Sequence, residues 1–202
     1  MLYRIGRGFS RNKSNADNNL LYQLPAAPSG GREVDGVAVH DFDGDDFIDL
    51  GLESFADGTS LFAEAGQSWT VSTSGVFDEN GYFIAKAGLD PAQRSFGIFR
   101  AGDDVKLYAR GHSTYLLSGY TPSEKINITV TWNGSVMRAY LNNDAPVGVT
   151  VGAAAEEVGQ RIIIGARSNG TGYFLDGALQ NVMIYNRALN ATEVAQHHTM
   201  FG

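Results

Sequence analysis

The sequence predicts an all-β protein, either a β-sandwich or a barrel, with a short helix only near its C-terminus. Many short segments alternate apolar and polar residues with a period of two, and no long segment has a helical period. The chain contains 25 Gly, 11 Phe and 9 Tyr, and only 18% of its residues are charged. This composition suits strands joined by tight turns. At 202 residues, the chain is long enough to bury the core of one domain.

The expected strands follow one another at short intervals from residue 34 onward, and turn residues separate them. Even spacing of this kind is typical of a sandwich. The expected ranges are 37–42, 47–50, 69–76, 82–86, 95–100, 105–110, 114–118, 126–132, 136–142, 161–166 and 179–185.

The segment 125–141 is the clearest single element and predicts a β-hairpin. Asn133-Gly134 is typical of a two-residue type I′ turn, which would place Trp132 opposite Ser135 and Ile126 opposite Leu141. We expect the face that carries Trp132 to be core and the other face to meet solvent. The residues expected on the solvent face are Asn127, Thr129, Thr131, Val136, Arg138 and Tyr140.

A second strand, 105–110, shows the same division. Val105, Leu107 and Ala109 share one face, and the polar residues share the other. Exposed aromatic rings with polar neighbours are suited to sugars, whose C–H faces stack on rings. The alternative is that they are cross-strand pairs that stabilise the sheet, or a subunit interface. The predicted ligand-binding residues are Lys106, Tyr108, Arg110, Arg138 and Tyr140.

One helix is expected, beginning after Asn190 and ending near His198. Asn190 is a suitable N-cap, and Glu193 completes a capping box. We expect His197 and His198 to lie in solvent at the helix C-terminus, where the helix dipole favours positive charge.

The N-terminal region differs from the rest in charge. Residues 1–13 carry +4, which leaves −11 for the remainder of a chain whose net charge is −7. Residues 23–31 are rich in Pro, Gly and Ser, as in a linker. We therefore divide the chain into an extended arm and linker, 1–33, and a sandwich, 34–202. One interpretation is that the arm mediates assembly, in a homo-oligomer or a protein lattice, through Arg4, Arg7, Arg11 and Lys13; the other is a solvated tail.

Composition and motifs exclude several classes of function. There is no Cys, so disulfides, Cys-type zinc sites and thiol nucleophiles are excluded. The net charge of −7 argues against nucleic acid as a partner. No apolar run approaches the length of about 18 residues that spans a membrane, and no secretory signal is recognisable. The expected setting is a virion or the extracellular space.

Four motifs in the right order resemble the LamG-like jelly rolls of the concanavalin A-like lectin/glucanase superfamily. They are Phe42–Gly51, Ile126–Asn142, Ile162–Arg167 and Leu175–Val194, within a match that covers about residues 34–198. The resemblance implies a two-sheet antiparallel β-sandwich with a concave and a convex face. It also implies adhesion, or binding of glycans or proteins, as the usual function, with catalysis in some relatives.

The sequence gives no support to catalysis. In the catalytic glucanases of that superfamily the acids lie on one strand in an ExDxxE pattern, which does not occur in this sequence. No GxSxG nucleophile motif occurs either. The sequence therefore predicts a non-catalytic module that recognises a glycan or surface receptor, carried on a virion as a capsid decoration or tail protein. The alternative is a polysaccharide-acting glycoside hydrolase or lyase of the same superfamily.

A cluster of acidic residues follows the first expected strand. Asp41, Asp43 and Asp45 have the spacing of the first ligands of an EF-hand calcium loop. Asp46 stands where that loop needs Gly, so an EF-hand is excluded. One interpretation is a looser Ca²⁺ site formed by Asp43, Asp45 and Asp46 with backbone carbonyls. The other is a tight turn whose Asp side chains cap the backbone.

Overall fold

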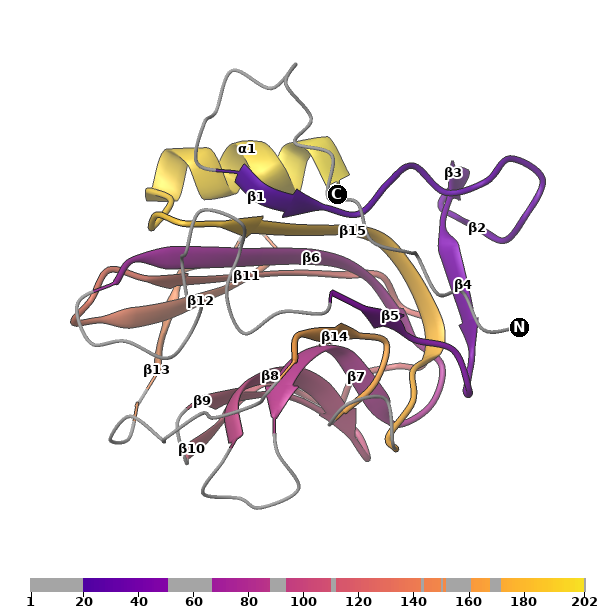
Figure 1. Ribbon diagram of the computed structural model, residues 1–202, viewed down its shortest axis with the longest axis horizontal. Helices are drawn as coiled ribbons and strands as arrows, with labels where there is room; N and C mark the ends of the chain where they lie inside the picture. Colours follow the sequence, from indigo (N-terminus) through magenta and orange to yellow (C-terminus); the bar gives the residue numbers. More distant parts are fainter. Residues whose placement is uncertain are drawn as a thin grey trace.

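The computed structural model describes residues 20–50, 67–87, 94–109, 112–142, 144–149, 151, 161–167 and 172–201. Two antiparallel sheets pack face to face, and a single helix among these residues, α1 (Ala191–Phe201), lies on the outer side of one of them (Figure 1). The predicted two-sheet sandwich with a short C-terminal helix is confirmed. In the described part of the chain no helix has the length and apolar character needed to cross a membrane.

The seven-stranded sheet has the order β1-β15-β6-β11-β12-β13, and β4 also pairs with β15. Its long central strands run through the middle of the sandwich in Figure 1, beneath α1. The strands of this sheet are β1 (Leu20–Gln23), β4 (His40–Asp43), β6 (Trp69–Phe77), β11 (Ile126–Trp132), β12 (Met137–Leu141), β13 (Val147–Val149) and β15 (Asp176–Tyr185).

The six-stranded sheet has the order β10-β9-β8-β7-β14-β5. A separate two-stranded hairpin, β2 (Glu33–Val34) with β3 (Val37–Ala38), lies at one end of the sandwich. The strands of the six-stranded sheet are β5 (Ile48–Asp49), β7 (Gly81–Ala87), β8 (Arg94–Ala101), β9 (Asp104–Ala109), β10 (His112–Ser118) and β14 (Ile163–Ile164).

The core lies between the two sheets and is rich in aromatic rings. Phe77 of one sheet stacks on Phe83 of the other, with ring centroids 3.7 Å apart. Trp69 meets Phe96 edge to face at 5.3 Å. Contacts of these kinds contribute roughly 0.5–1.5 kcal/mol each beyond the area they bury. Trp69 and Trp132 are buried, as expected for core residues.

The hairpin β11–β12 forms, but its predicted turn is wrong. Trp132 pairs with Met137, so four residues, 133–136, form the loop in place of two. The side-chain oxygen of Asn133 accepts hydrogen bonds from the backbone N–H groups of Ser135 and Val136 (N···O 3.0 and 2.8 Å). This local capping by Asn competes with the type I′ turn. The register moves by two residues, and because strand side chains alternate with period two, each residue stays on its expected face.

The expected solvent face of this hairpin is largely buried, which corrects the prediction. Thr129 is 0% exposed, and Asn127 and Thr131 are also buried. The cause is α1, which turns back over the outer face of the seven-stranded sheet after β15 (Figure 1). Only Arg138 and Val136 of the expected set remain exposed, and Tyr140 is half-buried.

The helix begins as predicted. The Asn190 side-chain oxygen accepts hydrogen bonds from the N–H groups of Thr192 and Glu193, and a Glu193 carboxylate oxygen accepts one from the Asn190 N–H (2.8 Å). The helix continues to Phe201, one turn beyond the predicted end. His198 is buried and His197 is half-buried, so the expectation that both lie in solvent is wrong. Both histidines lie on the side of the helix that packs on the sheet.

The segment before residue 34 takes part in the sandwich. Residues 20–24 belong to the predicted arm and linker, yet β1 pairs with β15 and Leu24 is buried in the main core. The arm residues Arg4, Arg7, Arg11 and Lys13 lie outside the described residues.

Candidate functional site

A row of side chains crosses the outer face of the six-stranded sheet. Strand pairing places Tyr115 opposite Lys106, Lys106 opposite Phe99, and Phe99 opposite Tyr82. Residues directly opposite each other on adjacent strands lie on the same face of a sheet. Four strands, β10, β9, β8 and β7, thus present a continuous strip of rings with one lysine in it.

The loop that leads into β15 extends this strip by two residues. Tyr82 stacks on Phe99 with ring centroids 4.9 Å apart, and its edge meets Tyr173 at 6.3 Å. The guanidinium carbon of Arg167 lies 4.5 Å from the centre of the Tyr173 ring. Tyr173 is 59% exposed and has a φ of 49°, a left-handed conformation that costs energy in a residue with a side chain. The fold therefore holds an exposed Tyr beside Arg167.

A pocket of about 240 Å³ lies at this end of the strip. Its walls combine aromatic rings with hydrogen-bonding groups and two arginines. Among the described residues that line it, none is a carboxylic acid, although glycosidases of the usual kind need two. The lining residues are Asn80, Tyr82, Phe99, Arg100, Ala101, Tyr108, Ser113, Arg167 and Tyr173.

A glycine gives Tyr82 the space that it occupies. Gly97 lies on β8 opposite Tyr108 and Ala85. A Cβ atom at Gly97 would lie 2.8 Å from Cε1 of Tyr82, closer than real Cβ contacts. The absence of a side chain at residue 97 lets the Tyr82 ring lie low on the sheet, where it is only 6% exposed.

One rim of the pocket is fixed by hydrogen bonds to the β6–β7 turn. Arg100 donates to the carbonyl oxygens of Asp78 and Gly102, each at 2.8 Å, and the Gly102 N–H donates to the Asn80 side chain. Arg32 forms a bidentate ion pair with the Asp78 carboxylate, which lowers the pKa of Asp78. Hydrogen bonds and an ion pair within the chain thus position this rim of the pocket.

Two of the predicted binding residues lie in this region. The alternation in β9 is confirmed: Val105, Leu107 and Ala109 are fully buried, and Lys106 and Tyr108 lie on the outer face. Tyr108 lines the pocket. Lys106 sits 4.6 Å from the Tyr115 ring centre and 3.3 Å from the Asp104 carboxylate. Arg110 lies outside the described residues.

The other two predicted residues lie on the opposite side of the molecule. Arg138 and Tyr140 belong to β12 of the seven-stranded sheet, and the pocket belongs to the outer face of the six-stranded sheet. Tyr140 packs against the cluster that anchors α1, together with Leu20 and Phe201. The predicted residues therefore do not form one surface.

Sequence reasoning missed most of the pocket. Tyr82 and Phe99 fall in expected strands, Arg167 ends one of the four motifs, and none of these residues or Asn80 is predicted to bind a ligand. The period-two pattern of residues 95–100 indicates which face of the strand carries Phe99. Its position beside Lys106 also depends on which strands are neighbours, and the pattern does not give this. Contact between Tyr82 of β7 and the loop that holds Tyr173 is set by the tertiary fold.

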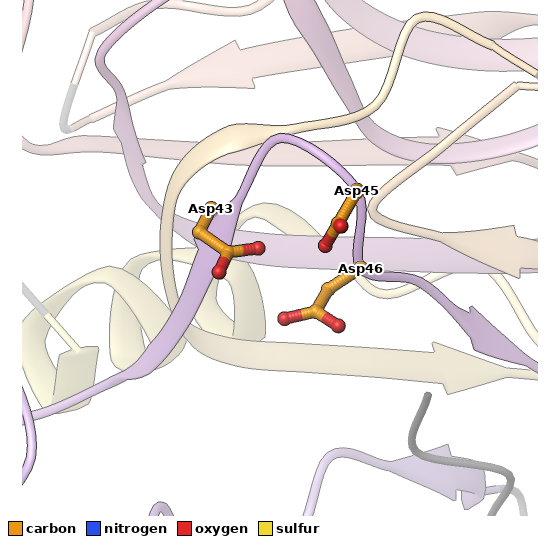
Figure 2. A group of neighbouring side chains, drawn as sticks. All are labelled: Asp43, Asp45 and Asp46. Atoms are coloured by element: carbon orange, nitrogen blue, oxygen red, sulfur yellow. The ribbon is translucent and has the colours of Figure 1, made fainter. Parts of the chain in front are cut away.

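The three predicted metal ligands do come together, at the turn between β4 and β5 (Figure 2). Carboxylate oxygens of Asp43, Asp45 and Asp46 all lie within 4.8 Å of one another. Partial burial, followed by the nearby charge of Asp43, raises the pKa of Asp46. Hard oxygen donors of this type fit the preferences of Ca²⁺. The cluster lies apart from the pocket, since none of the three lines it.

Comparison with solved structures gives the same fold. A sialidase of Trypanosoma rangeli, in complex with 2,3-difluoro-KDN, has a TM-score of 0.65 and 17% identity, over 91% of this chain and 33% of the sialidase. The CBM40 of the Ruminococcus gnavus IT-sialidase, bound to α2,3-sialyllactose, has a TM-score of 0.64 and 11% identity, over 91% of this chain and all of the CBM40. This chain thus spans about a third or less of the trypanosomal enzyme.

The sequence has no match among curated proteins. The family model described as the concanavalin A-like lectin/glucanases superfamily matches residues 54–195, well over half of the chain. The antiparallel sandwich is consistent with this match, and the chain belongs to the concanavalin A-like lectin/glucanases superfamily.

Proposed function

We propose that this protein is a non-catalytic glycan-binding module and that the pocket beside Tyr173 and Arg167 is its binding site. The observation that carries the proposal is the exposed Tyr173, held next to Tyr82, Tyr108 and a guanidinium on one open sheet face. Sugars combine apolar C–H faces with hydroxyl groups, so rings bordered by fixed hydrogen-bonding groups suit them.

The structural relatives are consistent with this function. The CBM40 of the Ruminococcus gnavus IT-sialidase is described as bound to α2,3-sialyllactose, and it matches this chain over its full length. The pocket chemistry here is independent of that likeness, because it rests on side chains of this chain. None of the described residues that line the pocket is a carboxylic acid, which favours binding over glycoside hydrolysis by the usual pair of carboxylic acids.

A glycan array on the intact protein is the direct test, followed by titration calorimetry with the glycans that bind. Tyr173→Ala removes the exposed ring, and we expect it to weaken binding at least tenfold. Tyr140→Ala is the matched control, because it removes a Tyr from the opposite sheet. Absence of binding to every glycan, or equal effects of the two substitutions, would contradict the proposed site. Release of reducing sugar from any polysaccharide would favour the hydrolase alternative.

The setting that we propose is a surface-borne protein, such as a virion decoration or tail component that presents this module to a glycan or receptor. The charge contrast between residues 1–13 and the remainder supports an attachment role for the N-terminal residues. Copurification of the protein with particles, and its release when those residues are removed, is the corresponding test.

A further inference from the structure

We infer that the binding site selects an acidic oligosaccharide, with its carboxylate at Arg167 and its following sugars laid across the sheet toward Tyr115. This inference rests on the proposed glycan-binding function and adds the ligand class and the direction in which the ligand lies. Two observations support it. The Arg167 guanidinium has no described counter-ion, and aromatic side chains extend from the pocket across the sheet to Tyr115.

Arg167 is a cation without a counter-ion in the described part of the structure. The guanidinium lies 4.5 Å from the Tyr173 ring centre and forms no described ion pair, and its Nε atom is buried without a hydrogen-bond partner. A buried donor left without a partner destabilises the folded state. A carboxylate that accepts from the outer N–H groups of the guanidinium would supply the missing counter-ion and form a charge-assisted, bidentate pair.

The other basic residues near the pocket are already engaged. Arg100 donates to two backbone carbonyls, and Lys106 pairs with Asp104 at 3.3 Å. No carboxylic acid is among the described residues that line the pocket, so no described lining residue competes with a ligand for Arg167. The Arg167 guanidinium is therefore the positive group available to a ligand, and it lies at the pocket end of the strip. A ligand with one acidic end would bind in one orientation along the strip.

The opposite end of the strip is aromatic and exposed but carries no net charge. Tyr115 is 59% exposed, and its ring is covered on one side by Lys106, whose charge Asp104 balances. From Tyr82 to Tyr115 the strip crosses three strand-to-strand intervals, roughly 14 Å at the usual sheet spacing. This length exceeds a single sugar ring and suits the neutral sugars that follow an acidic one.

The carboxylate can come from two classes of sugar, the sialic acids or the hexuronic acids. Two matched probe pairs distinguish them: α2,3-sialyllactose with lactose, and trigalacturonic acid with its methyl ester. Lactose lacks the whole sialyl residue together with its charge, whereas the methyl ester keeps all three sugars and lacks only the charge. Titration calorimetry on the full chain would measure affinity for all four probes, with the glycan array in parallel.

We expect at least one acidic probe to bind ten or more times tighter than its neutral partner. Arg167→Gln should abolish that ratio and Arg167→Lys should restore only part of it, because Lys lacks the planar fork. Tyr115→Ala should weaken the acidic oligosaccharide but leave unchanged the affinity for the free acidic monosaccharide, N-acetylneuraminic acid or galacturonic acid, which is titrated as a further probe. Arg138→Gln, on the opposite sheet, is the charge-matched control, and melting temperature verifies folding.

Equal affinities within each pair, or an unchanged ratio in Arg167→Gln, would overturn this inference. So would a neutral glycan that binds while both acidic probes fail. In each of these cases the proposed function survives if Tyr173→Ala still weakens the glycan that binds. If no glycan on the array binds at all, the proposed function fails, and the inference fails with it.

Discussion

His198, in the last turn of α1, lies with its Nε2 atom 3.1 Å from the Thr129 hydroxyl oxygen on β11. That hydroxyl in turn lies 2.9 Å from the Ser72 hydroxyl on β6. A chain of three polar side chains thus connects the helix to two central strands beneath it. The helix is part of the folded sandwich, joined to the sheet through a buried imidazole.

This contact predicts a pH-dependent stability. Burial, with a smaller contribution from His197, lowers the pKa of His198 below 6.5. The unfolded chain therefore binds a proton at higher pH than the folded chain does. The stabilisation from neutral His198 is complete above pH 6.5 and is lost as the pH falls below that value. We expect the melting temperature to fall over that range, as measured by calorimetry.

The matched substitutions are His198→Gln and His112→Gln. Glutamine keeps a donor for Thr129 but has no ionisable group, so His198→Gln should flatten the acid side of the profile even if it lowers stability overall. His112 is exposed on β10, and its substitution should leave the profile unchanged. Identical acid slopes for wild type and His198→Gln would show that this imidazole is not the titrating group.

The N-cap of α1 predicts a second stability effect. Asn190→Ala removes the acceptor for the N–H groups of Thr192 and Glu193. We expect the free energy of unfolding to fall by about 1 kcal/mol, the usual cost of losing such a cap. Urea denaturation measures it. Asn190→Ser, which can still cap the helix, should retain most of the stability, and a loss as large as that of the Ala variant would contradict the capping role.

Gly97 predicts an effect on ligand binding through the ring that it accommodates. Gly97→Ala places a methyl group against Cε1 of Tyr82, so the ring must rise into the pocket. We expect weaker glycan binding with the fold retained. Gly148→Ala is the control, because a Cβ atom there meets nothing within 4 Å. Unchanged affinity in Gly97→Ala would mean that the position of Tyr82 is unimportant for the ligand.

The acidic cluster at the β4–β5 turn predicts a charge effect. The pKa of Asp46 is raised above 3.8, so its ionisation disfavours the folded state. This destabilisation is present at neutral pH and is lost as the pH falls through the pKa that Asp46 has in the folded protein. Without calcium, Asp46→Asn should raise the melting temperature at pH 7, whereas Asp103→Asn, at an exposed position, should not.

Calcium separates the two interpretations of the same cluster. If Asp43, Asp45 and Asp46 hold Ca²⁺, calcium should raise the melting temperature of the wild type, and Asp46→Asn should reduce that increase. An identical melting curve with calcium and with chelator would leave the capped turn as the better interpretation.

The N-terminal residues can be tested by a deletion that removes no described strand. Removal of residues 1–19 leaves β1 intact, whereas removal of residues 1–31 also deletes a strand that pairs with β15. We expect the shorter deletion to preserve the melting temperature and to abolish self-association or particle attachment, measured by light scattering and cosedimentation. Self-association that persists in the shorter deletion would contradict the assembly role.

The fold was predictable because strand patterns are local and the sandwich follows from them. The alternation in residues 105–109 gave the buried and outer faces of β9 correctly. The burial of Thr129 was not predictable, because a polar strand face is covered only when a distant helix folds over it. The pocket was missed for the same reason: Tyr82, Phe99 and Tyr173 meet through strand order and a loop, neither of which local periodicity encodes.

The pairing of Leu20 with Tyr185 places the first described strand at an edge of the seven-stranded sheet, on the sheet that α1 also covers. Leu20 packs with Phe201 in the same cluster. Anything tethered through either of these segments would leave the sandwich from that layer. If the pocket on the six-stranded sheet binds glycans as proposed, an attachment through these segments would leave the binding face on the far side of the sandwich.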